Sequence, residues 1–135
     1  MMKSREPMVL VVDDEPDMCW ALEHILETNG VRAKRALTAQ EALTLLESER
    51  FPLVFLDAKL PDMEGLELAR QIREMNPSVR IVVVSGYFYR EDEAVRKALA
   101  EGLICGFVAK PFLHDEIRKV IETTPRRGSP PSSPT

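Results

Sequence analysis

Side chains suited to chemistry follow four of the apolar runs in this chain, each directly after the run ends. Because the carboxyl ends of parallel strands meet at one edge of an open sheet, where ligands bind, we expect these side chains to converge. Carboxylates, a hydroxyl and an amine would then share that edge. They are Asp13, Asp14 and Glu15 after the first run, Asp57 after the third, Ser85 after the fourth and Lys110 after the fifth.

Carboxylates crowded at one edge repel one another at pH 7, where an aspartate with its ordinary pKa of about 3.9 is ionised. Such a cluster requires either that some members are protonated or that a cation lies among them. The donors are oxygens with no His or Cys nearby, which favours a hard ion such as Mg²⁺, or Mn²⁺ in its place. The sequence therefore predicts a divalent metal.

A metal beside a free carboxylate suits phosphoryl transfer. The ion and a lysine neutralise the charge on the phosphoryl oxygens while a carboxylate attacks phosphorus in line, which forms an aspartyl phosphate. In such a site Ser85 would donate its hydroxyl to a phosphoryl oxygen, and Gly86 would let backbone N–H groups approach closely.

Each of these residues also has an ordinary structural interpretation. Asp13, Asp14 and Glu15 would complement the dipole of a helix that follows them, and Asp57 would belong to a turn. Ser85 alone carries little information. Only the joint appearance of these groups, each at the end of a strand, favours a functional site.

The elements that position these residues alternate between short apolar runs and longer amphipathic stretches, which is typical of a parallel sheet covered on both faces. The run at 31–36 alternates apolar with basic residues, which indicates a half-exposed edge strand. Thr38 and Glu41 form a predicted capping box, and Gly30 and Gly102 are expected to end helices. The expected strands are 8–12, 31–36, 53–56, 79–84 and 103–109, each followed by a helix.

Composition excludes several classes of protein. The chain has 135 residues, 44% of them hydrophobic, and no apolar run approaches the roughly 20 residues that span a bilayer. Its two cysteines exclude a disulfide scaffold and fit a cytoplasmic location. Without Arg126 and Arg127, residues 1–124 carry 16 basic against 22 acidic side chains, a net charge of −6, which argues against direct nucleic-acid binding.

The motifs, in their order along the chain, resemble the receiver domain of two-component response regulators. Asp13-Asp14-Glu15 resembles the acidic pair and its neighbour, and residues 57–65 resemble the phosphoacceptor segment with its proline and glycine. Ser85-Gly86-Tyr87 is similar to the switch segment, and Lys110-Pro111-Phe112 to the lysine motif. The resemblance implies a flavodoxin-like (βα)5 fold with a five-stranded parallel sheet in the order 2-1-3-4-5 and helices on both faces.

The resemblance further implies that Asp57 accepts a phosphoryl group from a histidine kinase or a histidine phosphotransfer protein. Asp14, Asp57 and the backbone carbonyl of Lys59 would hold Mg²⁺, and Asp13 would reach the metal through water. Lys110 would pair with the phosphoryl group, and its peptide bond to Pro111 would be cis. These are expectations from the family, not from spacing.

Signalling would then be a population shift in which phosphoryl oxygens draw the Ser85 hydroxyl inward and Phe107 moves into the vacated space. The ordinary interpretation of Phe107 is a core residue. The switch would act on an output domain or a partner protein, with a homodimer as one possible assembly. We predict a receiver domain over residues 7–124 and a Pro/Ser-rich disordered tail or linker start over 125–135.

Three features set this chain apart from the family's usual pattern. Lys59 lies two residues after the expected phosphoacceptor, where side chains help set the lifetime of the phosphoryl group. The segment from Ser85 to Lys110 is a few residues longer than usual, and within it Tyr87-Phe88-Tyr89 form either a partner-docking patch or a cluster packed over the loop.

Trp20 is expected near the acidic site, where its fluorescence would report metal or phosphoryl binding.

Two other functions compete with the receiver. A metal-dependent phosphohydrolase would use the same aspartate, lysine and Mg²⁺, but it needs a general acid/base and a cap for which the chain is short. A receiver-like interaction module would work without phosphorylation, but the presence of all five site residues argues against it. We therefore expect a phosphoacceptor switch and no turnover enzyme.

Overall fold

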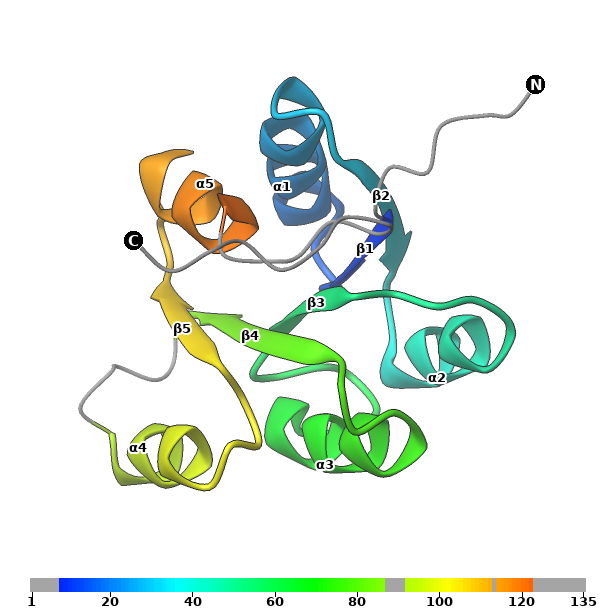
Figure 1. Ribbon diagram of the computed structural model, residues 1–135, viewed down its shortest axis with the longest axis vertical. Helices are drawn as coiled ribbons and strands as arrows, with labels where there is room; N and C mark the ends of the chain where they lie inside the picture. Colours follow the sequence, from blue (N-terminus) through cyan, green and yellow to red (C-terminus); the bar gives the residue numbers. More distant parts are fainter. Residues whose placement is uncertain (1–7, 87–91, 113, 123–135) are drawn as a thin grey trace, which may run out of the picture.

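Five parallel strands form one sheet in the order β2-β1-β3-β4-β5, and helices connect them (Figure 1). A computed structural model describes residues 8–86, 92–112 and 114–122. The predicted flavodoxin-like (βα)5 order is confirmed. The elements are β1 (Met8–Val12), α1 (Pro16–Thr28), β2 (Arg32–Ala36), α2 (Ala39–Ser48), β3 (Leu53–Asp57), α3 (Gly65–Met75), β4 (Arg80–Ser85), α4 (Glu93–Ala100), β5 (Gly106–Ala109) and α5 (His114–Glu122).

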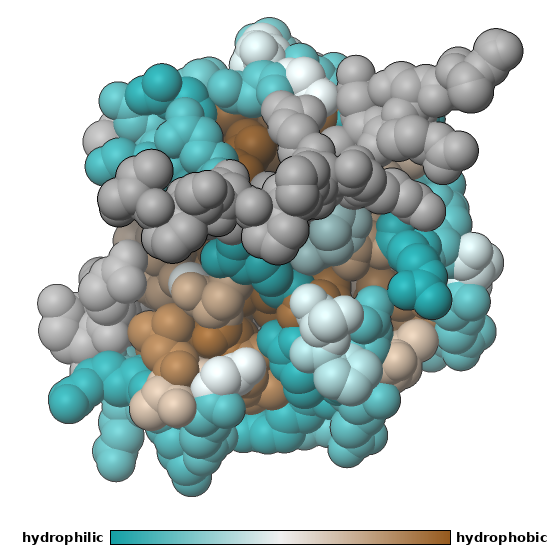
Figure 2. Space-filling model, in the orientation of Figure 1, coloured by the Kyte–Doolittle hydropathy of each residue, from teal (hydrophilic) through white to brown (hydrophobic). Residues whose placement is uncertain are grey.

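Alternate side chains of the buried strands point to opposite faces of the sheet, so the core has two halves. One half packs Val9, Val11 and other strand residues against α1 and α5, and the opposite half packs Leu10 and Val12 against α2, α3 and α4. Figure 1 shows these helices on the two sides of the sheet. Seen from the same direction, apolar side chains gather toward the middle of the molecule and hydrophilic ones line its lower rim (Figure 2).

The edge position of β2 is also confirmed, because this strand pairs with β1 alone and exposes its basic residues. Two strand boundaries differ from expectation in a way that matters for the site. β3 includes Asp57 and β4 includes Ser85, so both residues are the last of their strands. Their side chains therefore lie at the carboxyl edge of the sheet.

The fifth strand is shorter than predicted, because it begins at Gly106 and not at Leu103. The backbone N–H groups of Leu103 and Ile104 both donate to the carbonyl of Ala98, at 3.0 and 3.3 Å, and so close the last turn of α4. Both side chains are buried under that helix end. Their apolar character reflects burial in a turn, which hydropathy alone does not distinguish from a strand.

Helix ends largely follow the predicted signals. Gly30 and Gly102 adopt positive φ angles of 78° and 77°, as expected at helix C-termini. The Thr38 hydroxyl accepts a hydrogen bond from the backbone N–H of Glu41, as in a capping box. The Glu41 carboxylate accepts from the N–H of Leu37, one residue before the predicted partner. Within the described residues, no helix is both long and apolar enough to cross a bilayer.

Candidate functional site

The carboxyl edge of the sheet brings three carboxylates together. Asp13 and Asp14 directly follow β1, and Asp57 ends the neighbouring strand β3. One carboxylate oxygen from each of the three lies within 4.8 Å of the others. Asp13 is only 2% exposed and Asp57 only 7%, whereas Asp14 is open to solvent. The convergence predicted from the strand ends is therefore present.

Lys110 joins this cluster from the end of β5. Its Nζ lies 3.0 Å from Asp13 Oδ2, 3.6 Å from Asp57 Oδ2 and 3.5 Å from Glu15 Oε1. Burial alone would lower the pKa of this amine, but the surrounding carboxylates, with Asp13 foremost, outweigh burial and raise it above the ordinary value. Lys110 is therefore a fixed positive charge that three carboxylates share.

The surroundings of the Asp57 carboxylate disfavour its ionised form. Burial raises its pKa above the ordinary value, the nearby Lys110 ammonium opposes that change, and the charge of Asp13 adds to it. The N–H of Lys59 is 3.5 Å from Asp57 Oδ1, at the limit of a hydrogen bond. An additional cation beside Asp57 would relieve this unfavourable charge.

Asp13 is held firmly in place. Its Oδ1 accepts a hydrogen bond from the backbone N–H of Glu15 at 2.9 Å, and its backbone carbonyl accepts one from the thiol of Cys19. Burial, and then the charge of Asp13, raise the pKa of Cys19 to about 11. Cys19 therefore packs as a neutral thiol beneath the site.

The donor set fits a hard divalent cation. Among the described residues, the three possible metal ligands that gather here are all carboxylates, and an open hollow of about 520 Å³ beside them has room for water and a phosphoryl group. Asp14, Asp57, Lys59 and Lys110 are among the residues that line this hollow. Such oxygens and waters are the ligands that Mg²⁺ prefers.

Ser85 and Phe107 lie on the same face of the sheet. Phe107 pairs with Val83, two residues before Ser85, and alternate residues of a strand share a face. Both side chains are buried, and Phe107 belongs to the core half that packs against α4. The backbone carbonyl of Ser85 accepts a hydrogen bond from the N–H of Lys110 at 3.0 Å, and the bond from Lys110 to Pro111 is cis, as expected.

Comparison with known proteins decides the family. A family model described as the response regulator receiver domain matches residues 9–122. The chain belongs to this family. The receiver is 29% identical over 114 residues to sporulation initiation phosphotransferase F of Bacillus subtilis, which covers 84% of this chain and 90% of that relative. It is 35% identical to the nitrogen assimilation regulatory protein NtrX of Azorhizobium caulinodans over 84% of this chain, but spans only 25% of that relative.

Solved structures agree with this assignment. A CheY-like receiver domain protein from Methanospirillum hungatei superimposes with a TM-score of 0.79 at 29% identity, covering 87% of this chain and 91% of that one. The response regulator TrrA of Thermotoga maritima, whose structure is a complex with Mg²⁺-BeF, gives a TM-score of 0.75 at 30% identity and covers 87% and 97%. The family and its fold are thus shown by sequence and by structure.

Gly65 fits the backbone of the receiver's candidate phosphoacceptor segment most tightly. A Cβ atom at this position would lie 2.2 Å from the backbone oxygen of Asp57 and 2.8 Å from the Cα of Ala58. The N–H of Gly65 also donates to the carbonyl of Ala58 at 2.7 Å. Only a residue without a side chain lets α3 begin this close to the end of β3. At Gly86 a Cβ would make only an ordinary contact of 3.8 Å with Lys110 Cβ, so the packing of the protein itself leaves room for a side chain there.

We expect Gly65→Ala to destabilise the receiver by about 1–3 kcal/mol, because backbone atoms cannot yield to the added methyl group as a flexible side chain would. Urea unfolding measures the loss of stability, and amide chemical shifts of residues 57–59 report displacement of the loop. Gly86→Ala is the matched control, with an expected effect below about 0.5 kcal/mol. Equal stability of the two variants would contradict the steric explanation.

Two contacts in this region are absent from the sequence prediction. Asp62, in the loop after Asp57, accepts hydrogen bonds from the backbone N–H groups of Ala39 and Gln40 at 2.9 and 3.0 Å, and so joins this loop to the first turn of α2. These N–H groups lower the pKa of Asp62. The ion pair between Glu15 and Lys110 is also absent from the sequence prediction, which placed Glu15 at this edge without a partner.

Other predicted features lie away from the hollow or outside the described residues. Trp20 is 62% exposed on α1 and stacks on His24, with ring centroids 5.3 Å apart, and it does not line the hollow. The aromatic segment 87–89 and the tail 125–135 lie outside the residues that the structure describes. The predictions for these two segments therefore stay predictions.

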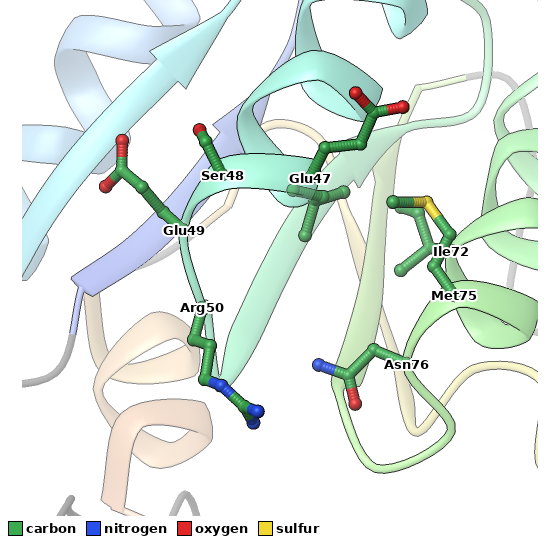
Figure 3. Close-up of a pocket in the computed structure, with 8 residues that line it drawn as sticks. Glu47, Ser48, Glu49, Arg50, Ile72, Met75 and Asn76 are labelled. Carbon is green, nitrogen blue, oxygen red and sulfur yellow. The ribbon is translucent and has the colours of Figure 1, made fainter.

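A second hollow, of about 460 Å³, lies between the C-terminal ends of α2 and α3 (Figure 3). It is lined in part by residues that lead into β3 and β4, such as Arg50 and Asn76, so it opens toward the amino ends of the strands. One of its acids, Glu49, is paired with Lys34. Because ligands of open parallel sheets bind at the carboxyl ends, this hollow is not the candidate site.

Proposed function

We propose that this receiver accepts a phosphoryl group on Asp57, in a Mg²⁺-dependent reaction, from a histidine kinase or a histidine phosphotransfer protein. The observation that carries the proposal is the position of the Asp57 carboxylate. It ends a central strand, faces the open hollow and has both Lys110 and two further carboxylates beside it. An in-line attack on phosphorus requires this combination of an ionised nucleophile and nearby positive charge.

Asp13, Asp14 and Asp57 are the residues that would hold Mg²⁺, together with the backbone carbonyl of Lys59. The three carboxylates and the adjacent hollow support this assignment, and Mn²⁺ suits the same oxygen donors. When bound, the ion supplies positive charge for the phosphoryl oxygens and relieves the repulsion between the carboxylates.

The remaining site residues have distinct tasks in this proposal. Lys110 opposes the rise in the pKa of Asp57 that burial causes, and it provides an ammonium group for a phosphoryl oxygen, since its Nζ is already 3.6 Å from Asp57 Oδ2. Ser85 offers a hydroxyl at the end of the adjacent strand β4. A shift of that hydroxyl toward the phosphoryl group would alter the packing around Phe107 on the same face, and so carry the signal toward α4.

The receiver would pass its signal to an attached output domain or to a separate partner. The curated relatives support both arrangements, because the chain matches most of the B. subtilis phosphotransferase but only about a quarter of NtrX and of the transcriptional regulator DctD of Rhizobium meliloti. The identity of the phosphodonor protein and of the partner is a matter for binding experiments with candidate kinases.

The phosphohydrolase alternative is tested by the stoichiometry of labelling. We expect phosphoramidate with Mg²⁺ to place at most one phosphoryl group on each chain, in a hydroxylamine-sensitive linkage that peptide mass spectrometry assigns to Asp57. EDTA should prevent the labelling, and a phosphate monoester should not be turned over. Continuous release of phosphate from the monoester would favour the hydrolase, and a label on any other residue would contradict the assignment of Asp57.

A further inference from the structure

Glu15 contributes a side chain to the site although it lies outside the three-carboxylate cluster. Its Oε1 is 3.5 Å from Lys110 Nζ, and its side chain remains 63% exposed at the mouth of the hollow. Lys110 itself is only 14% exposed. Glu15 therefore approaches the ammonium group from solvent, on the side from which a phosphodonor must enter.

The position of Glu15 is not explained by helix capping. Glu15 is the N-cap residue of α1, but its side chain makes no capping hydrogen bond, and Pro16 occupies the first helical position. Instead its backbone N–H donates to Asp13 Oδ1 at 2.9 Å. This bond ties the backbone of Glu15 to the buried carboxylate and leaves the Glu15 carboxylate available to Lys110.

The three partners of Lys110 are not equivalent. Asp13 is buried, with its Oδ2 3.0 Å from Lys110 Nζ, and Asp57 is also buried, with its Oδ2 at 3.6 Å. Glu15 is the exposed partner, so its carboxylate can separate from Lys110 without being left as an unpaired buried charge. A phosphoryl group on Asp57 adds negative charge next to Lys110 and must compete with Glu15 for the ammonium group.

We propose that Glu15 is a positioning residue. Its ion pair with Lys110, here called the latch, holds the ammonium group at the opening of the hollow, and its negative charge repels anionic phosphodonors. A phosphoryl group on Asp57 then displaces Glu15 from Lys110. This inference rests on the proposed function, in which Asp57 is the phosphoacceptor. Glu15 thereby weakens the capture of small phosphoanions that arrive without a protein to align them. The latch needs both the charge of Glu15 and its contact with Lys110.

The test is Glu15→Gln, which keeps the size of the side chain and removes its charge. Binding of beryllofluoride at saturating Mg²⁺ is followed by the ¹⁹F NMR signal of bound fluoride, which does not depend on an optical probe. The half-saturating concentration should fall by about two- to fivefold in E15Q, as expected for loss of one exposed ionic interaction. The difference should shrink in 0.5 M salt, where the Debye length falls to roughly 4 Å.

Asp17→Asn is the matched control. Asp17 is an exposed acid in the first turn of the same helix, but it forms no ion pair with Lys110. D17N should change the half-saturating concentration by less than half as much as E15Q. A spectroscopic readout accompanies it: in metal-free protein the ¹⁵Nζ resonance of Lys110, assigned by its loss in Lys110→Arg, should move in E15Q and stay in place in D17N.

The outcomes separate the latch from the proposed function. If the wild type does not bind beryllofluoride with Mg²⁺, the proposed function fails. If the wild type binds it and E15Q binds no more tightly, the latch is overturned and the phosphoacceptor role stands. If E15Q and D17N change the half-saturating beryllofluoride concentration equally, Glu15 acts only through the general surface charge, and the latch is also overturned. Urea unfolding of each variant confirms that the fold is intact.

Discussion

Asp57→Asn should abolish phosphoryl labelling completely and, in metal-free protein at pH 7, stabilise the fold by on the order of 1 kcal/mol, within the ordinary range for one substitution. The loss of labelling follows because an amide cannot act as the nucleophile. The gain in stability follows because burial and the charge of Asp13 raise the pKa of Asp57, so the fold disfavours its ionised form. The amide is nearly isosteric and carries no charge.

The pH dependence of this gain has a definite sign. A carboxyl group whose pKa is higher in the folded state than in the unfolded state costs stability at every pH above the folded pKa. The cost disappears as the pH falls through the folded pKa toward the ordinary value of 3.8. The stability difference between Asp57→Asn and wild type should therefore be largest at neutral pH and close to zero below pH 3.8.

Urea unfolding with EDTA at several pH values measures this difference, with Asp17→Asn as the control for loss of one exposed acid. Addition of Mg²⁺ should reverse the order, because an ion that binds the folded wild type stabilises it by mass action and Asp57→Asn has lost one ligand. A variant less stable than wild type at pH 7 without metal would show that the attraction to Lys110 outweighs burial of the carboxylate.

The acidic site could be predicted from the sequence because it depends on topology. Once the alternation of strands and helices indicates a parallel sheet, the residue after each strand must lie at one edge of that sheet. This placement does not depend on the conformations of the side chains. Asp13 after β1, Asp57 at the end of β3 and Lys110 after β5 are placed by this rule alone. The backbone topology brings these residues to one edge, and the conformation of the Lys110 side chain then completes the contacts with Asp13 and Asp57.

The ion pair of Glu15 with Lys110 and the tight packing at Gly65 could not be predicted in this way, because they depend on directions and distances in three dimensions. An acid before a helix usually serves the helix dipole, and only the bond from its N–H to Asp13 shows why Glu15 turns to Lys110 instead. Gly65 lies where the start of α3 closely approaches the backbone of Asp57. The residues around Gly65 in the sequence do not indicate how close this approach is. The prediction of a strand at Leu103 is wrong because a residue buried in a turn and a residue buried in a strand have the same hydropathy.

Lys110→Met should lower the free energy of unfolding by about 3 kcal/mol in metal-free protein, and slow labelling with phosphoramidate by roughly 100-fold or more. The loss of stability arises at Asp13, because this carboxylate is 2% exposed and loses the ammonium group that lies 3.0 Å away. The loss of rate arises because Asp57 and the phosphoryl oxygens lose the same positive charge. Lys119→Met, at an exposed position on α5, controls for the removal of a lysine.

The partner of Lys110 is identified by a double-mutant cycle. Asp13→Asn added to Lys110→Met should recover much of the lost stability, because no uncompensated buried charge then remains. The pKa of Lys110 is raised in the fold, so its contribution is complete below its ordinary pKa of 10.5 and is lost only as the pH rises through the higher folded value. The stability difference between wild type and Lys110→Met should therefore be insensitive to an increase in pH from 7 to 9. Additive effects of the two substitutions would show that Asp13 does not depend on Lys110, and would remove the reason for placing this pair at the centre of the site.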